Sequence, residues 1–97
     1  MNLRWDARAL QDLREIRKYI AKQGSPAAAD RVRKHLRARA NNLRGSPLMG
    51  VSSGNPSIRI LAPTRYPYRI YYSVLGDEIV ILHIRHTARQ TPDDLGL

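Results

Sequence analysis

The apolar residues of this chain change their spacing partway along it, and this change limits the folds that the chain can adopt. From residue 7 to about residue 43 they recur every three or four positions, which lays an apolar stripe along a helix. From residue 58 to residue 86 they more often alternate with other residues, as in a strand with one covered face. The sequence therefore predicts an α+β fold in which a helical part precedes most of the strands.

Two helices are predicted in the first part of the chain. Gly24 ends the first helix, which begins at residue 7, and Ser25 with Pro26 supplies the N-cap and the first residue of the second. The expected buried stripes are Leu10, Leu13, Ile16 and Ile20 on the first helix, and Ala28, Val32, Leu36, Ala40 and Leu43 on the second. The short turn between them predicts an antiparallel helical hairpin.

One strand is predicted before the helices, at residues 3–5, and three after them. A surface loop at residues 44–57 is followed by strands at 58–62, 68–74 and 78–86, and Gly76-Asp77 suits a tight turn between the last two. This order predicts a small, mostly antiparallel sheet with the helical hairpin packed on one face. Because 97 residues can bury one modest core, residues 1–97 are predicted to form a single domain with a loosely ordered tail at 87–97.

Strand parity assigns side chains to the two faces of this sheet. The helices are expected to cover Ile70, Tyr72, Val74, Val80, Leu82 and Ile84. The other face is expected to gather Arg59, Arg69, Tyr71, His83 and Arg85, together with Leu61, Ile79 and Ile81. Exposed apolar residues among cations favour a partner-binding surface. Phosphate contact or acid–base chemistry is a second interpretation, since arginine stabilises phosphate and histidine titrates near neutrality, and an ordinary solvent-facing surface is a third.

Positive charge is concentrated in the middle of the chain. The formal net charge is +9, and between Arg31 and Gly76 there are eight Arg and one Lys with no Asp or Glu. Such a field attracts phosphate backbones or an acidic protein. The excess of Arg over Lys, fourteen to three, favours bidentate contacts to carboxylate or phosphate.

Several classes of protein are disfavoured by what the sequence lacks. The absence of cysteine excludes disulfides and thiolate chemistry, and no apolar run approaches the ~20 residues that cross a bilayer, so a cytoplasmic protein without membrane contact is predicted. His83 and His86 should lie on opposite faces of their strand, and His35 stands alone on the second helix. Neither a metal site nor a cofactor is therefore predicted. The paired Asp93-Asp94 of the tail is expected to be solvated charge.

Two blocks of the sequence together resemble the RelE/ParE superfamily of bacterial toxins, and the resemblance covers nearly the whole chain. The pattern of Trp5, Ala9, Asp12-Leu13, Ile16 and Tyr19-Ile20 is similar to the first helix of that superfamily. The run from Tyr66 to Tyr72, followed by the run from Ile79 to Arg89, is similar to its final hairpin. The resemblance implies the toxin of a type II toxin–antitoxin pair, neutralised by an acidic antitoxin.

Two activities occur in this superfamily, and the resemblance distinguishes between them. RelE-like members cut messenger RNA in the ribosome without metal, using basic residues on the sheet and commonly an aromatic residue near the C-terminus, whereas ParE-like members inhibit DNA gyrase. Here no aromatic residue follows Tyr72, and residues 44–57 contain no Lys. The ending from His86 to Arg89 is more similar to the ParE-like type. The resemblance thus favours a non-enzymatic gyrase inhibitor.

Two alternatives to gyrase inhibition stay open. In a ribosome-dependent endonuclease, the candidates for phosphate stabilisation and acid–base work would be Arg69, Arg85, His86 and Arg89. The other alternative is a basic binding module without toxicity.

Overall fold

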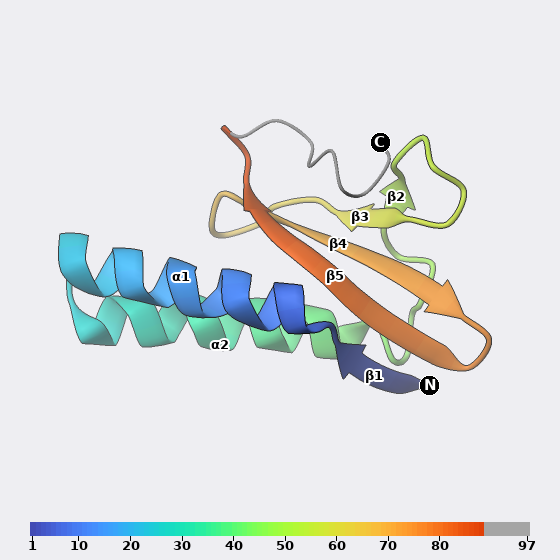
Figure 1. The fold of residues 1–97 in the computed structure, drawn as a ribbon, viewed down its shortest axis with the longest axis horizontal. Helices are drawn as coiled ribbons and strands as arrows, with labels where there is room; N and C mark the ends of the chain where they lie inside the picture. Colours follow the sequence, from blue (N-terminus) through green and yellow to red (C-terminus); the bar gives the residue numbers. More distant parts are fainter. Residues whose placement is uncertain (89–97) are drawn as a thin grey trace.

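The computed structural model describes residues 1–88 and arranges them as a helical hairpin against one side of a sheet (Figure 1). The α+β class predicted from the sequence is confirmed. The elements in chain order are β1 (Asn2–Trp5), α1 (Ala7–Gln23), α2 (Pro26–Asn42), β2 (Val51–Ser52), β3 (Arg59–Leu61), β4 (Tyr68–Leu75) and β5 (Glu78–His86). Of the predicted tail, residues 89–97 lie outside the described part, including Asp93 and Asp94. Neither helix in residues 1–88 is long and apolar enough to cross a membrane.

The sheet has five strands in the order β1-β5-β4-β3-β2. β1 runs parallel to β5, with Asn2 opposite Glu78 and Trp5 opposite Ile81, while the other pairings are antiparallel. The sheet is therefore mixed, and mostly antiparallel as predicted. β2 was not predicted, because its two residues are both exposed and show no alternation.

Local signals place the starts of both helices and the end of α1 close to their predicted positions. The Asp6 carboxylate accepts from the Arg8 backbone N–H at 3.0 Å, and the Ser25 hydroxyl accepts from the Ala28 N–H at 3.1 Å. Each bond satisfies a donor that the first turn of a helix leaves unpaired. At the other end of α1 the Gly24 N–H donates to the Ile20 carbonyl at 2.8 Å. The hairpin is therefore specified by its caps as well as by its apolar stripes.

The core lies between the helical hairpin and the sheet. Its largest fully buried side chains are Tyr72, Leu36, Leu43, Leu61, Ile70, Ile79 and Ile81. The predicted stripe of α2 is buried with one difference: Ala29 is buried, and Ala28 is only half-buried. On α1 only Leu13 of the predicted stripe is fully buried, and Ala9 and Asp12 are buried beside it.

A β-bulge in β5 overturns part of the predicted assignment of faces. Tyr71 lies opposite His83 and Tyr72 opposite Ile81, so Leu82 is an extra residue with no partner on β4. An extra residue reverses the parity of the strand on one side of it. Ile79 and Ile81 consequently join the core, whereas they were expected on the face turned away from the helices.

Three other side chains also differ from the predicted faces. Val80 lies opposite Ser73, on the face away from the helices. Leu82 is half-buried outside the core, and Leu61 lies opposite Ile70 within it. The expected exposed patch of Leu61 and Ile81 therefore does not exist.

Candidate functional site

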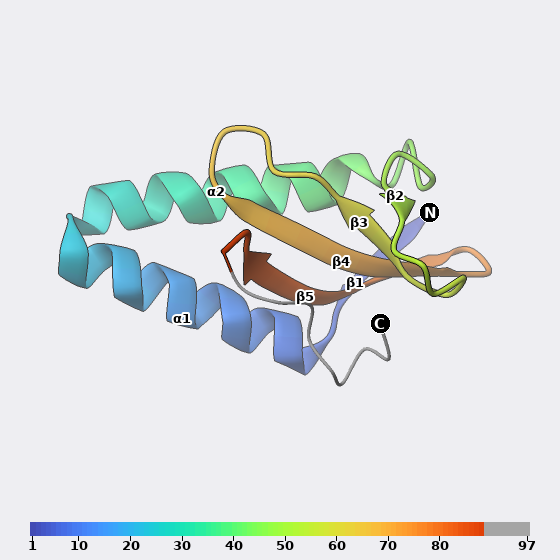
Figure 2. The ribbon, with the colours of Figure 1, turned by 90° about the horizontal axis from the view of Figure 1, so that it is seen from above.

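The sheet face turned away from the helices, called the second face from here on, brings together four of the five predicted binding residues. Figure 2 views the molecule from this side, with the strands running between α1 and α2. Arg69 lies directly opposite Arg85, and Tyr71 lies directly opposite His83. Two positions along a strand correspond to about 7 Å, so the two pairs are neighbours on one surface.

Arg59 does not belong to this cluster, which corrects the prediction from strand parity. It lies opposite Tyr72, a core residue, and therefore points to the helix side of the sheet. There its Nη2 donates to the Leu48 carbonyl at 3.3 Å. Alternation along β3 correctly predicted that Arg59 and Leu61 share a face. The register with β4 shows that this face is the one toward the helices. Arg59 thus holds the segment before β2 and is not placed to bind a partner on the second face.

The Arg69–Arg85 pair sets the electrostatics of the second face. Both side chains are half-buried, and like charges directly opposite one another on a sheet are unfavourable. Arg69 Nη1 donates to the Thr87 carbonyl at 3.4 Å. Arg85 Nε is buried and has no hydrogen-bond partner among residues 1–88. A carboxylate or phosphate group between the two guanidinium groups would relieve the repulsion and accept from their terminal nitrogens.

The Tyr71–His83 pair is connected to α1 by a hydrogen bond between His83 and Asp12. The Asp12 carboxylate oxygen Oδ2 accepts from His83 Nδ1 at 3.1 Å and from the Ile84 backbone N–H at 3.1 Å. Beyond Ile81, where pairing with β1 ends, α1 therefore supplies a partner for this edge of β5. Tyr71 is 2% exposed and His83 is 3% exposed, so these two residues shape the second face and offer a partner little surface.

Sequence reasoning did not single out Asp12 as a site residue, although a signal was present. Asp12 lies one position before Leu13 and three after Ala9, so it falls within the apolar stripe of α1. A carboxylate at such a position requires a buried donor. The partner itself could not be found in the sequence, because it lies 71 residues further along the chain.

A hollow of about 400 Å³ lies between α1 and the end of β5. Its lining consists of Asp12, Glu15, Ile16, Tyr19, Tyr68, Ile84, Arg85, His86 and Ala88. The His86 ring stands edge-on to Tyr68 with 5.4 Å between ring centroids, and its Nδ1 accepts from the Ala88 N–H at 3.0 Å. In the neutral ring the proton is therefore on Nε2.

The residues named for a nuclease are only partly brought together. Arg85 and His86 both line the hollow, whereas Arg69 lies on the second face and Arg89 lies outside the described residues. His83 and His86 lie opposite Tyr71 and Tyr68, and so point to opposite faces. Residues 1–88 contain no group of three or more His, Cys, Asp or Glu that could hold a metal ion.

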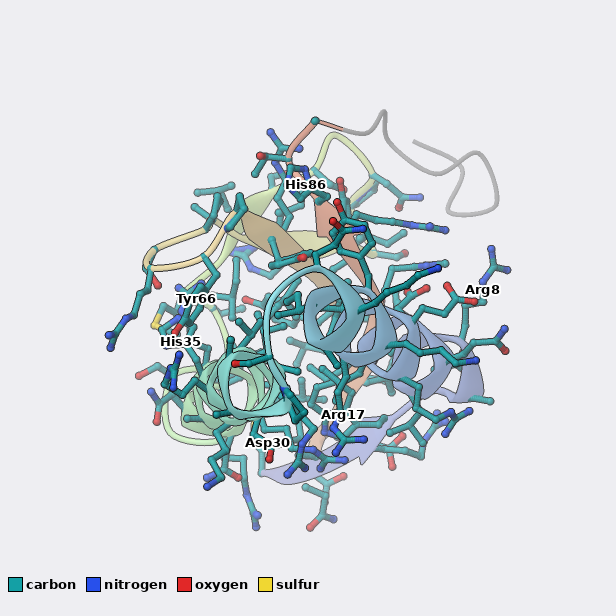
Figure 3. All side chains as sticks on the ribbon, turned by 90° about the vertical axis from the view of Figure 1, so that its left-hand side faces the viewer. Arg8, Arg17, Asp30, His35, Tyr66 and His86 are labelled. Atoms are coloured by element: carbon teal, nitrogen blue, oxygen red, sulfur yellow. The ribbon has the colours of Figure 1, made fainter. Side chains whose placement is uncertain are left out.

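A separate cluster joins α2 to the segment between β3 and β4. His35 Nε2 lies 3.2 Å from the Thr64 hydroxyl oxygen, and its ring stands edge-on to Tyr66 at 5.1 Å between centroids (Figure 3). Burial, and then the charges of Arg39 and Arg65, lower the pKa of His35 below its ordinary value of 6.5. Burial also lowers the pKa of the Arg39 guanidinium, whose Nη1 donates to the Ala62 carbonyl.

Comparison with known proteins connects this geometry to one group. The model of a family described as the ParE toxin of the type II toxin–antitoxin system parDE matches residues 3–91. Toxin RelE2 of Caulobacter vibrioides is 38% identical over 86 residues, which cover 88% of this chain and 93% of that protein.

Solved structures show the same arrangement of elements. A chain of the chromosomal ParDE system from P. aeruginosa superposes with a TM-score of 0.81 at 27% identity, covering 89% of this chain and 95% of that one. A chain of the intact E. coli RelBE toxin–antitoxin complex superposes with a TM-score of 0.67 at 22% identity, covering 91% and 98%, and so shares the fold.

Proposed function

The chain belongs to the ParE toxins of type II toxin–antitoxin systems, within the RelE/ParE superfamily, and on this premise we propose that it inhibits DNA gyrase without catalysing a reaction. The observation that carries the choice of gyrase is the match to the ParE family model over residues 3–91. The similarity to a ParDE structure supports the same branch. Gyrase is a cytoplasmic enzyme, so we expect the toxin to act in the cytoplasm.

The proposal includes a cognate acidic antitoxin that neutralises the toxin. The similar structures from P. aeruginosa and E. coli are of toxin–antitoxin systems, which supports such a partner. On this chain the facing, half-buried arginines Arg69 and Arg85 favour an anionic segment. A carboxylate of the antitoxin placed across the second face would accept hydrogen bonds from these side chains and lower their mutual repulsion.

A supercoiling assay tests the gyrase proposal. Purified toxin is added to gyrase, ATP and relaxed plasmid, and we expect the supercoiled product to decrease as the toxin concentration rises. Toxin premixed with its antitoxin is the matched control and should leave supercoiling intact. Full supercoiling at a large molar excess of free toxin would contradict the proposal.

The hollow beside β5 favours a second candidate function, cleavage of messenger RNA on the ribosome. Its lining includes both Arg85 and His86, and the relative at 38% identity is named RelE2. In such a cleavage the 2′-hydroxyl attacks the phosphorus and its proton passes to water, while the Arg85 guanidinium stabilises the charge on the phosphoryl oxygens. As the P–O5′ bond breaks, His86 in its imidazolium form gives a proton to the leaving 5′-oxygen.

Primer extension on translated messages separates the two functions. The gyrase proposal expects no new 5′ ends after expression of the toxin. New ends that disappear in His86→Gln, together with unaffected supercoiling, would establish the nuclease instead.

A further inference from the structure

A groove between α1 and α2 is walled by arginines on both sides. It has a volume of about 320 Å³ and is lined by Leu10, Leu13, Arg14 and Arg17 of α1 and by Arg33 and Arg37 of α2. Figure 3 shows Arg17 and Asp30 on this side of the hairpin, opposite to His86. We call it the arginine groove, and it is separate from the second face.

The charges of the arginine groove are not balanced by the residues around it. Asp30 Oδ1 accepts from Arg17 Nε at 3.3 Å and lies 3.9 Å from Arg33 Nε, so one carboxylate serves two cations. Arg37 lies over the Trp5 ring, 5.4 Å from its centroid. Neither Arg14 nor Arg37 has an ion pair with a carboxylate among residues 1–88. An adjoining hollow adds Lys18 and Glu15, whose charges cancel.

Helical spacing directs these like charges into one groove. Leu10, Leu13, Arg14 and Arg17 are three, four and seven positions apart and so share one face of α1. Arg33 and Arg37 are four apart on α2, a spacing at which like charges oppose each other. Solubility alone does not require the arginines of α1 and those of α2 to line the same groove. Four arginines around one groove instead raise a positive potential inside it, which attracts an anion.

We propose that the arginine groove binds the phosphodiester backbone of a single nucleic-acid strand. Arg14 lines it from α1 and Arg37 from α2, and guanidinium groups bind phosphate oxygens through paired N–H donors. An acidic amphipathic peptide fits less well, because it needs apolar surface to anchor it. The groove offers only part of one leucine, since Leu13 is 3% exposed and Leu10 is half-buried. Phosphate binding draws its affinity from charge and does not need that surface.

Fluorescence anisotropy with a labelled oligothymidylate of about 12 nucleotides tests the proposal on the full chain. The groove variant is Arg14→Glu with Arg37→Glu. The matched control is Arg31→Glu with Arg65→Glu, which makes the same change in net charge at two exposed arginines that do not line the groove. We expect the groove variant to bind at least ~10-fold more weakly and the control at most ~3-fold more weakly. The slope of log K against log salt should become less steep by about 1.4 in the groove variant, about 0.7 for each lost contact.

Three results would overturn the proposal. The wild-type protein could fail to bind the oligothymidylate at low salt. The two double variants could lose affinity equally, which would mean that the general field of the molecule is responsible. A polyglutamate peptide of the same charge could bind more tightly than the oligothymidylate, which would identify an acidic protein as the occupant. Arg14→Gln with Arg37→Gln, checked by thermal unfolding, guards against loss of binding through misfolding and should show the same ordering.

Discussion

The Asp12 carboxylate joins α1 to β5 by accepting hydrogen bonds from His83 and from the Ile84 N–H. Asp12 and His83 are both buried, so no water replaces a lost acceptor easily. This single side chain orients the His83 imidazole on the second face, and it satisfies the Ile84 N–H at an edge of β5 that no strand of residues 1–88 covers. Asp12 therefore adds a polar connection between α1 and β5 to the apolar packing of Ala9 and Leu13.

Replacing Asp12 by alanine should destabilise the fold. Two buried donors lose their acceptor, which costs about 2–4 kcal/mol in the free energy of unfolding. Urea denaturation measures this, with Glu15→Ala on the exposed side of the same helix as the control and an expected change within about 0.5 kcal/mol. Equal effects of the two substitutions would mean that the Asp12 bonds contribute nothing.

Arg69 and Arg85 should both contribute to antitoxin binding. Their side chains face each other on the second face, so Arg69→Ala or Arg85→Ala is expected to weaken the complex by at least about 1 kcal/mol. Arg59→Ala should leave the affinity unchanged, because Arg59 lies on the helix side of the sheet. Isothermal titration calorimetry distinguishes the three variants, and a loss in Arg59→Ala alone would reverse the assignment of faces.

The bulge in β5 shows which parts of the elements could be predicted from the sequence. Caps, periodicity and turn residues are local signals, so the two helices and the bounds of β5 agree with prediction. The extra residue Leu82 leaves no such signal, since Ile79, Val80, Ile81 and Leu82 are all apolar and either parity reads as a buried strand. Register between strands is likewise set by tertiary packing, which is why Arg59 was assigned to the wrong face while Arg69, Tyr71, His83 and Arg85 were grouped correctly.

Gly50 marks a close contact between the segment before β2 and the core. A Cβ at this position would lie 2.8 Å from the Ile60 carbonyl oxygen and 2.7 Å from the Tyr72 hydroxyl oxygen. The same hydroxyl donates to the Pro47 carbonyl and accepts from the Gly50 N–H, each at 2.9 Å. Gly50→Ala should therefore cost about 1–3 kcal/mol of stability. Gly45→Ala, where a Cβ would meet no atom within 4 Å, is the control, and thermal unfolding of the two variants compares them.

The His35 cluster should make the attachment of the β3–β4 segment depend on pH. Because the pKa of His35 is lowered from 6.5, the unfolded chain binds more protons at this ring than the folded chain as the pH falls. Its contribution to stability is present above pH 6.5 and is lost as the pH falls through the lowered pKa. We expect wild type to lose more stability than His35→Gln between pH 7 and pH 5 in urea denaturation. An identical loss in both would show that other groups carry the pH dependence.

At the scale of the whole molecule, the net charge of +9 acts on association more than on the fold. Such a charge attracts an acidic partner over a distance that salt shortens. The association rate constant with the antitoxin should therefore fall by ~10-fold or more between low and high salt, while the dissociation rate constant changes less. Surface plasmon resonance measures both, and an association rate constant independent of salt would exclude long-range attraction by the toxin.

The parallel pairing of β1 with β5 has a consequence for synthesis of the protein in the cell. Residues 2–5 find their place in the sheet beside residues 78–81, near the opposite end of the chain. A ribosome must therefore translate the codons of β5 before the first strand can dock. Any shortened product that stops before β5 leaves β1 without the strand that it pairs with. Premature termination should therefore release fragments that are inactive as toxins.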